Sequence, residues 1–148
     1  MQNPWRIRVS SGTFPSRFSK SFTIDKQPIG GPGDRTYVIL EGGVSHGGNV
    51  DIALRLAKAA ADAGASAFKL QHYHADDFIS KQDQEWHERM RRKQLTDGEI
   101  IRVARACENF GITFLCTAHT LPAFEFLRFT VRVPAFKVGS GEIGNASF

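Results

Sequence analysis

Two lysines on strand-like segments are the residues of this chain best placed for chemistry. Residues 67–71 read AFKLQ and residues 135–139 read AFKVG, so Lys69 and Lys137 each lie between apolar neighbours. Side chains alternate along a strand, so each lysine points to the face opposite its apolar neighbours. An ammonium group that loses its water without meeting an anion costs several kcal/mol. The two segments therefore predict inward-facing cations that share one anionic ligand.

Further polar residues follow predicted strands at similar positions. Glu41 follows the apolar run at residues 37–40, and a Ser-Gly-Glu string follows Lys137 at residues 140–142. The carboxyl ends of parallel strands hold the ligand sites of both barrels and open doubly wound sheets. We therefore expect these side chains to converge at one end of a parallel sheet. The candidate set is Glu41, Lys69, Gln71, Thr117, Lys137, Ser140 and Glu142.

The elements that carry these residues alternate between strands and helices. Asn49 is a suitable N-cap for a helix to about Ala63, and Thr96 with Glu99 forms a capping-box pattern for a helix through Phe110. Residues 21–34 predict a short hairpin followed by a Gly/Pro turn. The predicted strands are 37–40, 67–71, 113–117 and 135–138, the first of them buried, with a short helix at 122–128.

This order predicts an α/β fold with parallel pairing and right-handed crossovers. A (β/α)₈ TIM barrel typically takes about 250 residues, and four strands occupy residues 37–138 here. We therefore expect parallel (β/α) units that form about the first half of such a barrel, preceded by the hairpin. Residues 1–20 are expected to be a disordered extension, and residues 21–148 the N-terminal half of the barrel.

Composition excludes several classes of protein. The 148 residues are 41% hydrophobic and 23% charged, as in one globular domain, and no apolar run approaches the ~20 residues that span a bilayer. The net charge of +4 equals the four bases of residues 1–24, which contain no acid. The balanced remainder argues against nucleic-acid binding. The basic start fits either a disordered extension or a transit peptide.

Two cysteines, a histidine pair and a basic cluster are not expected to take part in the chemistry. Cys107 and Cys116 lack metal-type spacing and are expected to be free thiols. His72 and His74 form an H-x-H pair, which we expect to be solvent-exposed and to which we assign no metal. The basic cluster within residues 89–93 is expected to be a solvated helix face.

Four strings, in order, resemble the N-acetylneuraminate (sialic acid) synthases over about residues 22–148. They read VILEGGVSHGGNVDIALRLAKAAADAGASAFKLQ at 38–71, FISK at 78–81, FGITFLCTAHT at 110–120 and VPAFKVGSGEIGN at 133–145. Either KxQ or PAFKxxSGE alone is a weak signal. Both together, correctly separated, identify the family by resemblance.

The resemblance implies a (β/α)₈ enzyme that condenses phosphoenolpyruvate with an N-acylated hexosamine, typically N-acetylmannosamine. The products are a nonulosonic acid and phosphate, in cytoplasmic sialic acid biosynthesis. A divalent metal, Mn²⁺ or Mg²⁺, is implied as cofactor, with histidine ligands on later strands that this chain lacks. A homodimer is implied for the full-length form, through a C-terminal antifreeze-like domain that is also absent here.

Site roles carry over from the motifs position by position. Glu41 matches the acid after the first strand, and Thr117 matches the threonine of the family's S-T-P-F string. The resemblance implies catalytic roles for Glu41, Glu142 and Lys137. It implies phosphoenolpyruvate contacts for Lys69 and Gln71 of KxQ, Thr117, and Lys137 and Ser140 of KxxSGE.

The chain also departs from the family pattern, and rival interpretations stay open. Ser45 replaces the asparagine before the loop histidine, and Ala118 and His119 replace the usual proline and phenylalanine, changes that would alter sugar selectivity or weaken activity. One rival is a catalytically inactive truncated fragment or interaction protein, because half a barrel has two unpaired sheet edges. Others are a Schiff-base aldolase with Lys137 as nucleophile, which gives no reason for Gln71, and a heptulosonate or octulosonate synthase.

Overall fold

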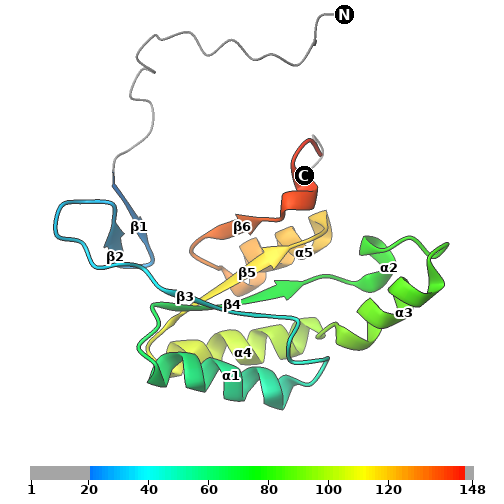
Figure 1. Ribbon diagram of the computed structural model, residues 1–148, viewed down its shortest axis with the longest axis horizontal. Coiled ribbons are helices and arrows are strands. Elements are labelled where there is room, and N and C mark those ends of the chain that lie inside the picture. Colours follow the sequence, from blue (N-terminus) through cyan, green and yellow to red (C-terminus); the bar gives the residue numbers. More distant parts are fainter. Residues whose placement is uncertain (1–20, 146–148) are drawn as a thin grey trace, which may run out of the picture.

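A four-stranded parallel sheet forms the centre of the molecule (Figure 1). The computed structural model describes residues 21–145, so the predicted extension at residues 1–20 lies outside the described residues. The strand order is β3-β4-β5-β6, as the alternating sequence pattern predicts. The strands are β3 (Ile39–Gly43), β4 (Ala67–His72), β5 (Thr113–Ala118) and β6 (Phe136–Val138).

Helices α1 (Val50–Asp62) and α4 (Asp97–Asn109) lie side by side along one face of the sheet (Figure 1). Both begin where the sequence predicts. The Asn49 side chain accepts hydrogen bonds from the N–H groups of Asp51 and Ile52, and Thr96 and Glu99 form a complete capping box. Such caps satisfy N–H groups that have no partner within the helix.

The other elements connect these units. The predicted hairpin is confirmed as β1 (Phe22–Ile24) paired antiparallel with β2 (Gln27–Ile29). Among residues 21–145, no helix is both long and apolar enough to cross a membrane. The connecting helices are α2 (Ala75–Phe78), α3 (Gln84–Lys93), α5 (Leu121–Glu125), the π-helix η1 (Phe126–Val131) and the 3₁₀ turn η2 (Ser140–Glu142).

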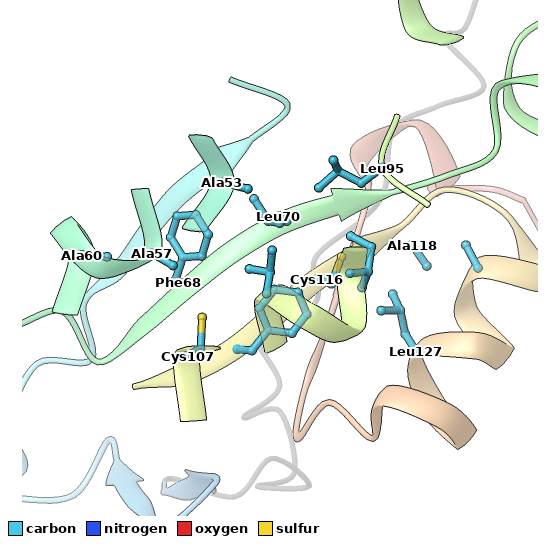
Figure 2. Close-up of a cluster of buried hydrophobic side chains, with 14 of the residues drawn as sticks. Ala53, Ala57, Ala60, Phe68, Leu70, Leu95, Cys107, Cys116, Ala118 and Leu127 are labelled. Carbon is cyan, nitrogen blue, oxygen red and sulfur yellow. The ribbon is translucent and has the colours of Figure 1, made fainter. Parts of the chain in front are cut away.

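The apolar core lies between the sheet and its helices (Figure 2). Phe68 and Leu70 of β4 are fully buried there, against an alanine stripe of α1. Small side chains on the helix let its backbone approach the strand, and the larger strand residues fill the space. The stripe consists of Ala53, Ala57 and Ala60.

The two cysteines and the basic cluster follow the sequence prediction. Cys107 and Cys116 are free and buried, and burial raises the pKa of the Cys107 thiol to about 12. On α3, Arg89 is exposed and its guanidinium lies 5.5 Å from the Trp86 ring centroid. The cluster is therefore largely a solvated helix face.

The first strand is not buried, contrary to the sequence prediction. Val38 is 51% exposed and Ile39 42% exposed. β3 is an edge strand of the described sheet, so its outer flank has no neighbouring strand. On the opposite edge, Phe136 and Val138 of β6 are also exposed. A closed barrel has no edges, so two apolar edges fit the predicted partial barrel.

The loop between β3 and α1 depends on Gly48, which adopts φ +83° against the backbone at the end of α3. A Cβ there would lie 2.1 Å from the carbonyl oxygen of Arg92. Gly48→Ala should therefore lower the free energy of unfolding by about 2–4 kcal/mol, from backbone strain and a clash. Chemical denaturation followed by circular dichroism measures this change.

Gly47→Ala is the matched control, because Gly47 also has positive φ (+61°) but has open space around it. It should cost only about 1–2 kcal/mol, the penalty of the left-handed conformation. Equal losses in the two variants would show that the contact with Arg92 contributes nothing.

Candidate active site

Strand register places five of the predicted site residues in two adjacent rows at the carboxyl end of the sheet. Glu41 of β3 is opposite Lys69 of β4. In the next row, Gln71 of β4, Thr117 of β5 and Lys137 of β6 are successive partners. Partner residues on parallel strands point to the same face. The sheet therefore brings together an acid, two cations, an amide and a hydroxyl.

Lys69 is the most buried cation of this group, with its side chain 12% exposed, and it forms an ion pair with the Glu41 carboxylate. Its Nζ also lies 3.4 Å from the Thr117 hydroxyl oxygen. Glu41 therefore already compensates the charge of Lys69, so the burial of this lysine does not by itself indicate a bound anion. The Glu41 side chain is 48% exposed, so this carboxylate remains open to solvent.

Lys137 has a different environment from Lys69. It is exposed on the edge strand β6 and is therefore not the buried cation that the sequence predicted. Thr117, only 3% exposed, separates the two lysines, since it is the strand partner of Lys137 and a contact of Lys69. The lysines thus flank one hydroxyl group on the same face.

The Ser-Gly-Glu string forms η2, directly after β6. Ser140 is exposed, whereas Glu142 is half-buried. The Glu142 carboxylate accepts a hydrogen bond of 2.8 Å from the side-chain amide of Asn145. Its backbone N–H donates to the Gly139 carbonyl over 3.0 Å, which closes the turn. Glu142 therefore lies beyond the end of β6 on a short, hydrogen-bonded turn.

His119 belongs to this site and was not among the predicted residues. A Cβ at Gly139 would lie 3.4 Å from its Cε1 and 3.9 Å from Cγ of Glu142. Burial lowers the pKa of His119, the Glu142 carboxylate opposes this, and the ammonium groups of Lys137 and Lys69 add to it. His119 lies two residues after Thr117, so strand alternation was the signal that could have found it.

The His119 ring is held by aromatic contacts. Its centroid lies 4.6 Å from that of Phe78 and 6.2 Å from that of Tyr73. Its Nε2 is buried without a hydrogen-bond partner in the described part of the chain. The site therefore contains a buried imidazole nitrogen whose pKa responds to two cations and a carboxylate.

The glycine-rich loop closes the β3 side of the site. His46 is buried, and its Nδ1 accepts a hydrogen bond of 3.1 Å from the Gly48 N–H. At Gly43, where φ is +52°, a Cβ would lie 3.3 Å from a Glu41 carboxylate oxygen and 3.5 Å from the Gln71 amide nitrogen. A side chain at position 43 would thus crowd the space between Glu41 and Gln71.

The residues around Lys69 do not form a metal site. In the described chain, the three-residue group suited to a metal is His72, His74 and Asp97. His72 alternates with Lys69 along β4, so it points to the opposite, helix-covered face. It is also 1% exposed, so the expectation of a solvent-exposed histidine pair is wrong for His72.

A cavity of about 760 Å³ lies at the other end of the sheet. The hairpin and the segments leading into β4 and β5 line it, including Lys26, Arg35, Ser66 and Thr113. None of the predicted site residues contributes to it. The cavity and the polar face at the carboxyl ends are therefore separate features.

The sequence profile of the NeuB family matches residues 56–148. The chain belongs to the NeuB family. This confirms the resemblance to sialic acid synthases that the motifs indicated. The matched segment begins within α1 and includes β4, β5 and β6, which carry most of the candidate residues.

Individual proteins of known sequence or structure agree with this assignment. An uncharacterized Methanocaldococcus jannaschii protein is 39% identical over 113 residues, which cover 76% of this chain and 33% of that protein. The N,N'-diacetyllegionaminic acid synthase of Legionella pneumophila is 26% identical, covering 76% of this chain and 35% of the synthase. The chain therefore spans about a third of the length of these relatives.

A solved structure supports the fold. The N-acetylneuraminic acid synthetase of Leptospira borgpetersenii, in complex with citrate, superposes with a TM-score of 0.81 at 27% identity. The match covers 87% of this chain and 44% of the synthetase. The parallel (β/α) units of this NeuB protein therefore correspond to part of the synthetase fold.

The buried imidazole of His119 predicts a pH dependence of stability. Because its pKa is lowered on folding, the unfolded chain binds more protons below the ordinary value of 6.5. Stability from this group is complete above pH 6.5 and is lost as the pH falls, by at most ~1.4 kcal/mol per pH unit. His119→Phe keeps an aromatic ring against Phe78 but has no group that titrates, so the part of the stability loss that comes from His119 should disappear.

Urea unfolding at pH 7.5 and pH 5.5 tests this prediction. The free energy of unfolding should fall less between the two pH values in His119→Phe than in the unmodified chain. An equal fall in both proteins would show that His119 does not titrate unfavourably in the folded state.

Proposed function

We propose that this NeuB chain supplies the phosphoenolpyruvate-binding half of a nonulosonic acid synthase. The reaction joins phosphoenolpyruvate to an N-acylated hexosamine and releases phosphate. The observation that carries the proposal is the grouping of Lys69, Thr117 and Lys137 beside Gln71 at the carboxyl ends of three strands. Because the chain spans about a third of its curated relatives, the activity is proposed for the chain together with the remaining part of such a synthase.

The chemistry of phosphoenolpyruvate matches this group of side chains. The molecule carries a phosphate and a carboxylate, and two ammonium groups with hydroxyl and amide donors can bind both. Lys69 is already oriented by its ion pair with Glu41. An incoming anion then shares Lys69 with Glu41 and leaves that carboxylate freer to act on the second substrate. Ser140 and Lys137 complete the contacts from the β6 side.

In the proposed reaction, C3 of phosphoenolpyruvate attacks the aldehyde carbon of the open-chain sugar. A C–C bond forms, the aldehyde oxygen takes up a proton, and C2 becomes cationic. Water adds to C2 and loses one proton, which leaves a hydroxyl and the phosphate oxygen on the same carbon. The C2–O bond to phosphate then breaks, phosphate leaves with that bond's electron pair, and the C2 hydroxyl gives up its proton to become the carbonyl. We assign Glu142 to stabilise the cation or orient the water, and Glu41 to the sugar oxygen. The divalent metal of the family would need ligands from outside the described residues.

The acceptor is proposed as N-acetylmannosamine or a related N-acylated hexosamine. The Leptospira and Legionella proteins are named for a neuraminic and a legionaminic acid respectively, so the family uses more than one acceptor. His119, in place of the family's phenylalanine, lies near Glu142 and is the residue here that we expect to affect acceptor choice. Cytoplasmic location and dimerisation of the longer protein are proposals from the same resemblance.

Phosphoenolpyruvate binding by the 148-residue chain tests the lysine assignments directly. Lys69→Met should weaken binding about tenfold or more, because a charge-assisted hydrogen bond contributes about 1.5–3 kcal/mol. Lys137→Met should weaken binding by a smaller factor, because Lys137 is exposed and water and salt screen its charge. Isothermal titration calorimetry measures the effect. Lys58→Met is the matched control, since Lys58 lies on α1 and pairs with Asp62. Equal affinity in all three variants would contradict the assignment.

Steady-state kinetics test the glutamates in a full-length form of the protein. Glu41→Gln and Glu142→Gln should each lower kcat by about 10²–10⁴-fold, as the loss of a general acid or base does. Near-unchanged values for both variants would overturn their roles. Incubation with pyruvate and borohydride should leave Lys137 unmodified, whereas trapping at Lys137 would establish a Schiff-base aldolase.

Phosphate release with phosphoenolpyruvate, N-acetylmannosamine and Mn²⁺ tests the chain alone. We expect no turnover by the 148 residues, because the described site is open along β6 and has no metal ligands. Turnover would contradict this expectation while supporting the proposed reaction. The full-length form should release phosphate only when both substrates are present.

A further inference from the structure

Three potential metal ligands converge on the helix-covered side of the sheet. Nε2 of His72 lies 3.0 Å from Oδ1 of Asp97, and Nε2 of His74 lies 3.2 Å from the same oxygen. The three ligand atoms all lie within 4.8 Å of one another. Two imidazole nitrogens therefore approach the same carboxylate oxygen, whereas a simple ion pair would need only one of them.

The contact between His72 and Asp97 is close but poorly aligned. Nε2 of His72 and Oδ1 of Asp97 are both buried and lie 3.0 Å apart, within ion-pair range. Among residues 21–145, neither atom has a partner with the alignment of a good hydrogen bond. The chain offers a direct contrast, because His87 and Asp76 form a true hydrogen bond of 2.9 Å. Buried polar atoms without partners are costly and call for a specific explanation.

The local structure holds the three residues in place. His72 is the last residue of β4 and His74 is the N-cap of α2, so their i, i+2 spacing along extended backbone puts them on one side. Asp97 is the first residue of α4, whose start is set by the Thr96–Glu99 capping box. The strand end and the helix start are both well defined, so the cluster does not depend on a loose loop.

We propose that His72, His74 and Asp97 form a binding site for a divalent first-row transition metal such as Zn²⁺. Two imidazole nitrogens and one carboxylate oxygen are ligands that such metals accept, at about 2.0–2.2 Å for zinc. Mg²⁺ and Ca²⁺ prefer sites made of oxygen ligands, so they do not fit this set. The side chains of His74 and Asp97 are 40% and 47% exposed, which leaves a coordination position for water.

This site is distinct from the phosphoenolpyruvate face. His72 shares its face of β4 with Phe68 and Leu70 of the core, and its ring lies 5.0 Å from that of Phe126. Lys69 points to the other face of the same strand. A metal here would link the end of β4 to the start of α4 and thus fix the strand that carries Lys69. Its role in this proposal is structural.

Zinc binding by the untagged 148-residue chain tests the proposal without any activity assay. Competition with a zinc-sensitive dye should show one Zn²⁺ per chain, and Zn²⁺ should raise the Tm. His74→Ala and Asp97→Asn should each weaken binding at least ~10-fold, the lower bound seen even for residues that only support a ligand. Both side chains are partly exposed, so the variants should keep the far-ultraviolet circular dichroism of the unmodified chain.

Asp76→Asn is the matched control, because Asp76 also pairs with a histidine near a helix start but has only one imidazole. Its zinc affinity should equal that of the unmodified chain, and Mg²⁺ should not compete with Zn²⁺. The proposal is overturned if the unmodified chain binds no Zn²⁺, or if His74→Ala and Asp97→Asn both retain full affinity. Cobalt, added in place of zinc, should give visible absorption bands that both variants lose.

Discussion

The buried charge of Lys69 is the constraint on which the candidate active site depends. An ammonium group with only 12% of its side chain exposed must be compensated, and the Glu41 carboxylate does this from the neighbouring strand. The pairing requires β3 and β4 to be adjacent, parallel and in the observed register. A shift of one residue would turn Lys69 into the alanine-lined core and expose Leu70. The ion pair of Lys69 with Glu41 therefore needs the observed register of β3 and β4, and it also favours that register.

β4 serves two chemically different faces. Lys69 and Gln71 point to the polar face, whereas Phe68, Leu70 and His72 point toward the helices. The strict alternation explains how one six-residue strand can contribute both to the proposed anion site and to the histidine cluster. It also keeps the two apart, because the backbone of the sheet lies between them.

Most of the fold could be predicted from sequence because its signals are local. The cap at Asn49, the capping box at Thr96 and the apolar strand runs depend on residues close in the chain. The contacts of Lys69 and His72 could not be predicted in this way, because they come from segments that only the tertiary structure brings together. The pairing of Lys69 with Glu41 joins two strands, and the burial of His72 requires α4 and η1 to cover the strand end. Strand alternation could have placed His119 on the face of Thr117, whereas only the fold brings it near Glu142.

The two lysines differ in a way that bears on how the site is completed. Lys69 is enclosed, so its interaction with an anion acts through a medium of low effective dielectric constant. Lys137 is exposed on β6, and water and salt screen its charge. Next to Lys137, Phe136 and Val138 are 37% and 53% exposed, an apolar edge beside a cation. Covering that edge with a further strand would bury apolar surface and also remove water from around Lys137. A strand added beside β6 would therefore also strengthen the proposed anion site.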